Sequence, residues 1–138
     1  IAEFRDRPGR LLVCATNFVR ALDAAFLRHG RFDYVLPIGL PDAEAREAIW
    51  TRYIPTDSLG DLDLPRLVEA SQGLTPADIE YAARRASQEA LGRAMRDGES
   101  AAGLETEDYL SALESTRATV SPEAAAEFSE DIESLARL

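Results

Sequence analysis

One asparagine and two arginines are the residues of this sequence whose types and spacing could do chemistry. Asn17 follows an apolar run, residues 11–15, and Arg28 and Arg31 flank Gly30. An amide directly after a buried strand lies at the strand's carboxyl end, where open α/β sheets collect their ligands. A guanidinium stays charged, and its planar fork can hold two phosphate oxygens. The pattern therefore indicates a ligand site whose arginines suit an anion.

Each of these residues also has a purely structural interpretation. An asparagine after a strand is often a turn residue that bonds its own backbone. The pattern of residues 22–28 predicts a short helix, which Gly30 would end in a left-handed conformation. Arg28 and Arg31 could then stabilise the negative end of that helix, which is worth about 0.3–1 kcal/mol. Residue types alone leave both interpretations open.

The residues around this site predict two strands. Residues 11–16 are apolar on both faces, as in the interior of a parallel sheet. Residues 34–40 form a second apolar run, in which Pro37 favours a short or edge strand. Cys14 is the single cysteine and lies inside the first run, so we expect a buried, inert thiol.

From residue 41 onward the sequence predicts helices. Asp42, Asp63, Thr75 and Ser121 are capping residues at helix starts, and Gly73 is a stop signal. The expected helices cover about 42–54, 64–72, 75–97, 106–115 and 120–138. In the first of them, the periodicity predicts an inward face of Ala45, Ala48, Ile49, Arg52 and Tyr53.

Composition excludes several classes of protein. The chain has 138 residues, of which 46% are hydrophobic and 29% charged, as in soluble globular proteins. No apolar run approaches the ~18–20 residues that cross a bilayer, and residues 1–10 carry charges where a signal peptide is apolar, so we expect a cytoplasmic chain. A net charge of −10 argues against a nucleic-acid partner. All basic residues are arginines, so the chain has no P-loop lysine.

Three stretches resemble the AAA ATPase family. Residues 15–33 contain A-T-N, then L-D-A-A and R-H-G-R-F-D, and resemble the family's second region of homology. Residues 73–79, GLTPADI, are similar to G-[FYH]-[ST]-G-A-D-[LI], and residues 106–113, TEDYLSAL, to T-x-E-D-F-x-x-A-L. Residues 120–138 resemble the extension after the second ATPase module of valosin-containing-protein-like unfoldases. The resemblance therefore covers nearly the whole chain.

The resemblance implies an α/β fold in three parts. Residues 1–40 would be the end of the large ATPase subdomain, with two strands and a short helix. Residues 41–116 would be an all-α helical lid, and residues 117–138 a C-terminal helical extension. In the family, the strand that leads into the P-loop separates the two predicted strands, and this chain lacks it. We therefore expect both strands to lack their native ladder partners.

The resemblance also implies roles for the arginines and the asparagine. Asn17 corresponds to sensor 1, whose amide has a donor and an acceptor and can contact both the γ-phosphate and the attacking water. Arg28 and Arg31 correspond to arginine fingers that reach the ATP bound by a neighbouring subunit.

A second set of residues is implied to lie near the adenine. Tyr53 occupies a position where many relatives have a histidine, and its ring could stack on the base. Packing within the lid is the alternative for Tyr53. Pro76 replaces a family glycine that lets adenine approach closely, and Ala77 follows it.

The parent that the resemblance implies is a ring-forming, hexameric ATPase that uses ATP with Mg²⁺, bound by ligands outside this chain. It would be a chaperone-like unfoldase that couples ATP hydrolysis to remodelling of protein substrates. The chain alone, without a P-loop, should be inactive. The alternative is a non-catalytic helical interaction module derived from such a lid. The C-terminal helix is expected either to cover its own lid or to contact a partner subunit.

Overall fold

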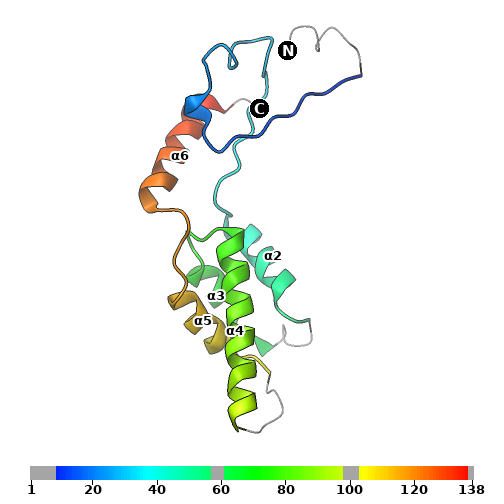
Figure 1. The fold of residues 1–138 in the computed structure, drawn as a ribbon, viewed down its shortest axis with the longest axis vertical. Coiled ribbons are helices and arrows are strands. Elements are labelled where there is room, and N and C mark those ends of the chain that lie inside the picture. Colours follow the sequence, from blue (N-terminus) through cyan, green and yellow to red (C-terminus); the bar gives the residue numbers. More distant parts are fainter. Residues whose placement is uncertain (1–8, 57–60, 98–102, 137–138) are drawn as a thin grey trace. The chain divides into compact units, whose positions relative to one another are not determined.

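The computed structural model describes residues 9–56, 61–97 and 103–136. Their elements, in chain order, are the 3₁₀-helix η1 (Val19–Ala21) and the α-helices α2 (Ala43–Tyr53), α3 (Leu64–Ala70), α4 (Pro76–Asp97), α5 (Thr106–Glu114) and α6 (Pro122–Leu135) (Figure 1). No helix among the described residues is long and apolar enough to span a bilayer.

The chain divides into two compact units. The helical unit is Gly39–Ala125, and the terminal unit consists of the described residues before Gly39 and after Ala125. The predicted domain boundaries at residues 40 and 116 stay predictions.

Side-chain caps begin the helices of the helical unit, as the sequence predicts. Asp42 and Asp63 each accept a hydrogen bond from the backbone amide three residues on, at 2.8 and 3.1 Å. At the start of α4, Asp78 N donates to Thr75 Oγ1 at 3.2 Å, and Thr75 N donates to Asp78 Oδ2 at 2.9 Å. Gly73, at φ 80°, turns the chain between α3 and α4. These caps satisfy amides that have no partner within the first helical turn.

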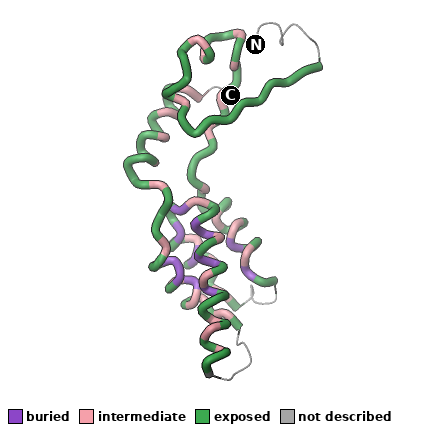
Figure 2. Tube along the Cα trace, viewed as in Figure 1, coloured by how far each residue is buried: buried purple, intermediate pink, exposed green. Residues whose placement is uncertain are grey.

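The core of the helical unit lies where α2, α3, α4 and α5 face one another (Figure 2). Its fully buried hydrophobic side chains are Trp50, Leu67, Ile79, Ala82, Ala86, Tyr109 and Ala112. The fully buried alanines of α4, Ala82 and Ala86, let neighbouring helices approach closely. The rings of Trp50 and Tyr109 meet edge to face, with centroids 5.8 Å apart.

The predicted inward face of α2 is confirmed only in part, for Ile49 and Tyr53, which pack against the core. Ala45, Ala48 and Arg52 are exposed, whereas Trp50 is fully buried. Burying a large indole removes far more apolar area from water than burying two alanines, so Trp50 decides which side of α2 faces the core.

The two predicted strands are also wrong. Among the described residues no strand forms, and only Val35 makes an isolated bridge. Leu11 is 85% exposed and Ile38 is 90% exposed. An interior strand needs a ladder partner on each side and cover on both faces, and the described residues supply neither. For the same reason Cys14 is exposed, contrary to the prediction of a buried thiol.

The short helix predicted at 22–28 is replaced by tight turns. Phe26 N donates to Asp23 O at 2.8 Å, and Asp23 Oδ1 accepts from Ala25 N at 2.8 Å. An aspartate that bonds the backbone two residues on favours a turn over a continued helix. The prediction for Gly30 is confirmed in part: it has φ 87°, although it follows a turn and not a helix.

Candidate functional site

A closed loop, residues 26–33, presents Arg28 and Arg31, and we call it the arginine loop. Its ends meet, because Phe32 N donates to Phe26 O at 3.4 Å and the two phenyl centroids lie 6.3 Å apart. Inside it, Arg31 N donates to Arg28 O at 3.2 Å. These contacts hold the backbone while both arginines are exposed. Within the described part of the chain, neither guanidinium is paired with an acidic side chain.

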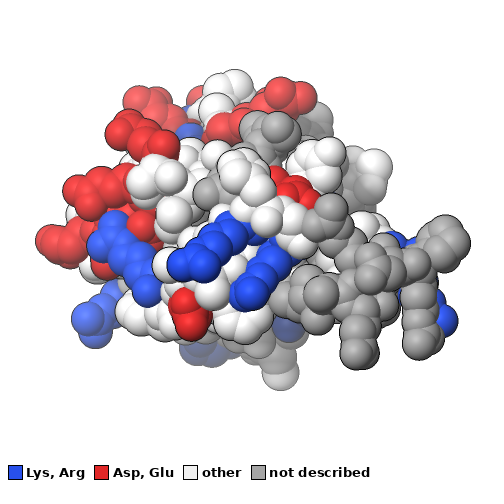
Figure 3. Space-filling view, turned by 90° about the horizontal axis from the view of Figure 1, so that it is seen from above, with Lys and Arg blue, Asp and Glu red and all other residues white. Residues whose placement is uncertain are grey.

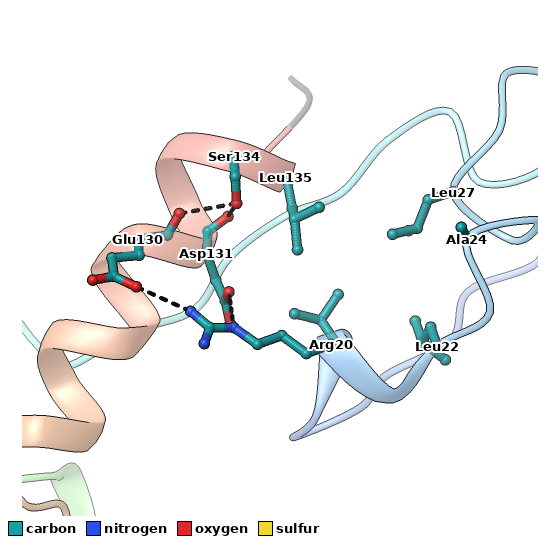
Figure 4. Close-up of a pocket in the computed structure, with 9 residues that line it drawn as sticks. Arg20, Leu22, Ala24, Leu27, Glu130, Asp131, Ser134 and Leu135 are labelled. Atoms are coloured by element: carbon teal, nitrogen blue, oxygen red, sulfur yellow. Dashed lines mark hydrogen bonds and ion pairs between the residues drawn. The ribbon is translucent and has the colours of Figure 1, made fainter.

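Arg20, which lies in η1, has the opposite environment. Its guanidinium pairs with Glu127 Oε1 at 2.6 Å. It also pairs with Asp131 Oδ1 at 2.6 Å and with Glu130 Oε2 at 3.3 Å (Figure 4). The hydrogen bond with Asp131 is the main cause that raises the pKa of Arg20 above its ordinary value. The positive charge of Arg20 is therefore balanced by carboxylates of α6.

An open pocket of about 550 Å³ lies beside these ion pairs. Its walls are Val19, Leu22, Ala24 and Leu27 on one side and Glu130, Asp131, Ser134 and Leu135 of α6 on the other (Figure 4). The described part of α6 thus contacts residues 19–27 of its own chain, a contact that neither predicted alternative for the C-terminal helix included.

Asn17 is exposed, in a bend of the terminal unit. The turn there is closed by its neighbour, since Phe18 N donates to Thr16 Oγ1 at 3.0 Å. Among the described residues no hydrogen bond of the Asn17 side chain is seen, so the structural interpretation of Asn17 as a self-bonded turn residue finds no support.

Tyr53 lies at the edge of the core of the helical unit, half-buried. Its hydroxyl donates to Glu80 Oε2 at 2.8 Å, and this hydrogen bond is the main cause that raises the pKa of Tyr53. Glu80 lies one helical turn after Pro76, and Pro76 and Ala77 are exposed. The structure therefore links Tyr53 to α4 one helical turn beyond Pro76.

Asp78 shares the cap of α4 with Thr75 and also has a second role, which no sequence pattern predicted. Asp78 is only 6% exposed and bonds both Thr75 and Thr119, which lies 41 residues along the chain. No local pattern could indicate Thr119, because the contact joins segments far apart in sequence.

The predicted site residues fall into two groups. Asn17, Arg28 and Arg31 belong to the terminal unit, and Tyr53, Pro76 and Ala77 belong to the helical unit. Both acidic and arginine side chains reach the face drawn in Figure 3.

Known proteins resemble more than half of the chain. It is 40% identical over 78 residues to an ATP-dependent zinc metalloprotease FtsH of Caldicellulosiruptor bescii, covering 56% of this chain and 13% of that protein. It is 39% identical over 88 residues to a Cell division cycle protein 48 homolog of Archaeoglobus fulgidus, covering 62% of this chain and 12% of that protein. The chain thus spans about an eighth of the length of these relatives.

A solved structure shares the fold. The crystal structure of the FIGL-1 AAA domain matches with a TM-score of 0.72 and 24% identity, over 89% of this chain and 43% of that one. No protein-family model matches the chain. The predicted resemblance is nevertheless confirmed: the FtsH and Cell division cycle protein 48 homologues of this chain are AAA ATPases, and the solved structure that shares its fold is an AAA domain.

Proposed function

We propose that this chain is the part of a ring-forming ATPase that completes the active site of a neighbouring subunit. Arg28 and Arg31 would act as arginine fingers on the ATP of that neighbour, and Asn17 would orient the attacking water. The observation that carries the proposal is the contrast within one segment: Arg20 is paired with three carboxylates, whereas Arg28 and Arg31 have none among the described residues.

The contrast supports a functional role for physical reasons. A guanidinium held by several carboxylates is neutralised and cannot serve a second anion. Exposed guanidinium groups on a closed, hydrogen-bonded loop keep their charge and fork geometry available for phosphate oxygens. Little ordering is then needed when the phosphate arrives, which favours catalysis by preorganised charge.

Tyr53, Pro76 and Ala77 would contribute the adenine side of the nucleotide site. Glu80 holds the hydroxyl of Tyr53, which would fix the orientation of the ring. The adenine would then stack on the face of the Tyr53 ring. Mg²⁺ and the P-loop would be supplied by residues outside this chain, and the isolated chain should not hydrolyse ATP. The parent would assemble as a homo-oligomeric, hexameric ring and remodel protein substrates in the cytoplasm.

A direct test uses the full-length parent. Arg28→Ala should lower ATP turnover by about 10³–10⁵-fold, because the transferring phosphoryl group loses its cationic partner. Nucleotide affinity should stay unchanged, since the finger acts on a neighbour's ATP. Arg96→Ala, which removes an exposed arginine from the last turn of α4, is the matched control and should leave turnover unchanged.

The alternative function is a non-catalytic helical interaction module. It would be favoured if the full-length parent neither binds nor hydrolyses ATP. If the parent hydrolyses ATP but Arg28→Ala and Arg96→Ala both turn it over within a few-fold of the wild type, Arg28 is structural and the finger assignment fails.

A further inference from the structure

One carboxylate, that of Asp78, holds two segments of the helical unit together. Asp78 Oδ2 accepts from Thr75 N at 2.9 Å and from Thr75 Oγ1 at 2.8 Å. It also accepts from Thr119 N at 3.2 Å, and Asp78 Oδ1 accepts from Thr119 Oγ1. The bonds to Thr75 complete the cap of α4. The two bonds to Thr119 are additional and serve another segment.

These hydrogen bonds keep the carboxylate charged. Burial of Asp78 acts to raise its pKa, but the bonds from Thr119 and Thr75 outweigh burial, and the pKa is lowered below its ordinary value. The charge also lies in the first turn of a 22-residue helix, where the helix dipole favours an anion.

Thr119 belongs to the connector between α5 and α6, residues 115–121. Near α5, Thr116 Oγ1 donates to Ala112 O at 2.8 Å. At the other end, Ser121 begins α6 by accepting from Ala124 N at 3.2 Å. Asp78 is thus the side chain that fixes the middle of the connector, two residues before the helix cap at Ser121.

We propose that Asp78 is a positioning residue that couples nucleotide contact at Pro76 and Ala77 to the connector that leads into α6. This inference rests on the proposed function, which places the nucleotide beside the first turn of α4. Asp78 lies in that same turn, so a shift of the turn toward the nucleotide moves its carboxylate. The connector then either moves together with the Asp78 carboxylate or loses its hydrogen bonds to it.

Coupling of this kind is reciprocal. If nucleotide contact changes the strength of the Asp78–Thr119 bonds, then weakening those bonds must change nucleotide affinity by the same factor. Typical coupling between two sites is about 5- to 150-fold in affinity. A connector that only supported the fold would not respond to nucleotide.

The experiment is hydrogen exchange on the full-length parent with and without ADP, together with the ADP dissociation constant. In the wild type, ADP should change exchange at the Thr119 amide by at least several-fold. Thr119→Val removes the hydroxyl but keeps the side-chain shape, so most of that response should be lost and ADP affinity should shift by at least about 5-fold. Thr119→Ser restores the hydroxyl and should restore both readouts.

The matched control is Thr116→Val, which removes a hydroxyl from the same connector that bonds Ala112 O instead of Asp78. It should leave the ADP response and affinity unchanged. The proposal is overturned if ADP binds to the wild type without altering exchange at Thr119, or if both valine variants behave alike; the proposed function would survive either result. Absence of ADP binding would overturn both.

Discussion

The indole Nε1 of Trp50 donates a hydrogen bond to Ser71 Oγ at 3.1 Å, and both side chains are fully buried. Ser71 Oγ in turn donates to Leu67 O at 2.8 Å. The hydroxyl therefore joins α2 to the end of α3 inside the core. A buried donor and acceptor satisfy each other here, which is the condition under which burying polar groups is tolerated.

Replacing Trp50 should destabilise the helical unit strongly. Trp50→Ala should lower the free energy of unfolding by about 3–5 kcal/mol, because it removes a fully buried ring and leaves a cavity. Trp50→Phe should cost less, since the ring contact with Tyr109 is partly kept. Urea unfolding followed by circular dichroism measures both, and Tyr81→Phe, at a 56% exposed residue of α4, is the control. If Trp50→Ala and the control were equally stable, Trp50 would not be packed in the core as described.

The hydroxyl of Tyr109 offers a prediction of opposite sign. It is buried without a hydrogen-bond partner in the described part of the chain. Tyr109→Phe removes an unsatisfied polar group and should leave stability unchanged or raise it, by up to about 1–3 kcal/mol. Tyr53→Phe is the comparison, because it breaks the bond to Glu80 and should lower stability. Thermal unfolding of the two variants measures both stability changes. A larger loss of stability in Tyr109→Phe than in Tyr53→Phe would contradict this prediction.

Asp78 predicts a pH dependence of stability. Its pKa is lowered in the folded chain, so its contribution to stability is present above the ordinary value of 3.8 and is lost as pH falls through the folded pKa. The stability difference between wild type and Asp78→Asn should therefore be largest near neutral pH and shrink below 3.8. Other carboxylates titrate in both proteins, so the difference isolates Asp78. A difference that stays constant with pH would rule out the lowered pKa.

The ion pairs of Arg20 predict that docking of α6 depends on salt. They are partly exposed, so each should contribute little to stability and be weakened by screening. Arg20→Gln should speed hydrogen exchange in residues 127–135 at low salt, and the effect should fade at high salt. Arg52→Gln, an exposed arginine of α2, is the control. If exchange in α6 is the same in both variants, the ion pairs do not hold the helix.

Subunit mixing tests whether Arg28 acts across a subunit boundary. Arg28→Lys should recover little activity, because an ammonium offers a point charge and no fork. Mixing Arg28→Ala subunits with subunits whose P-loop is inactivated should restore part of the ATP turnover, since each supplies what its neighbour lacks. If mixing restores none while both proteins still assemble, Arg28 does not act in trans.

The sequence by itself determined the features that depend on a few neighbouring residues. Asp42, Asp63 and Thr75 cap helices because the atoms they bond lie within three positions along the chain. Gly73 and Gly30 take left-handed conformations because only glycine does so without steric cost. The family could also be inferred from sequence, because its motifs are short runs with fixed spacing.

Only the tertiary structure decided the features that join distant segments. Trp50 faces the core because α3, α4 and α5 together enclose an indole, which the periodicity of α2 alone does not show. Thr119 meets Asp78, and Arg20 meets Asp131, across separations of 41 and 111 residues. The apolar run at 11–16 shows that a local pattern is not sufficient where distant segments are needed. Its composition suits a strand, but a strand forms only where other segments supply its ladder partners, and among the described residues none does.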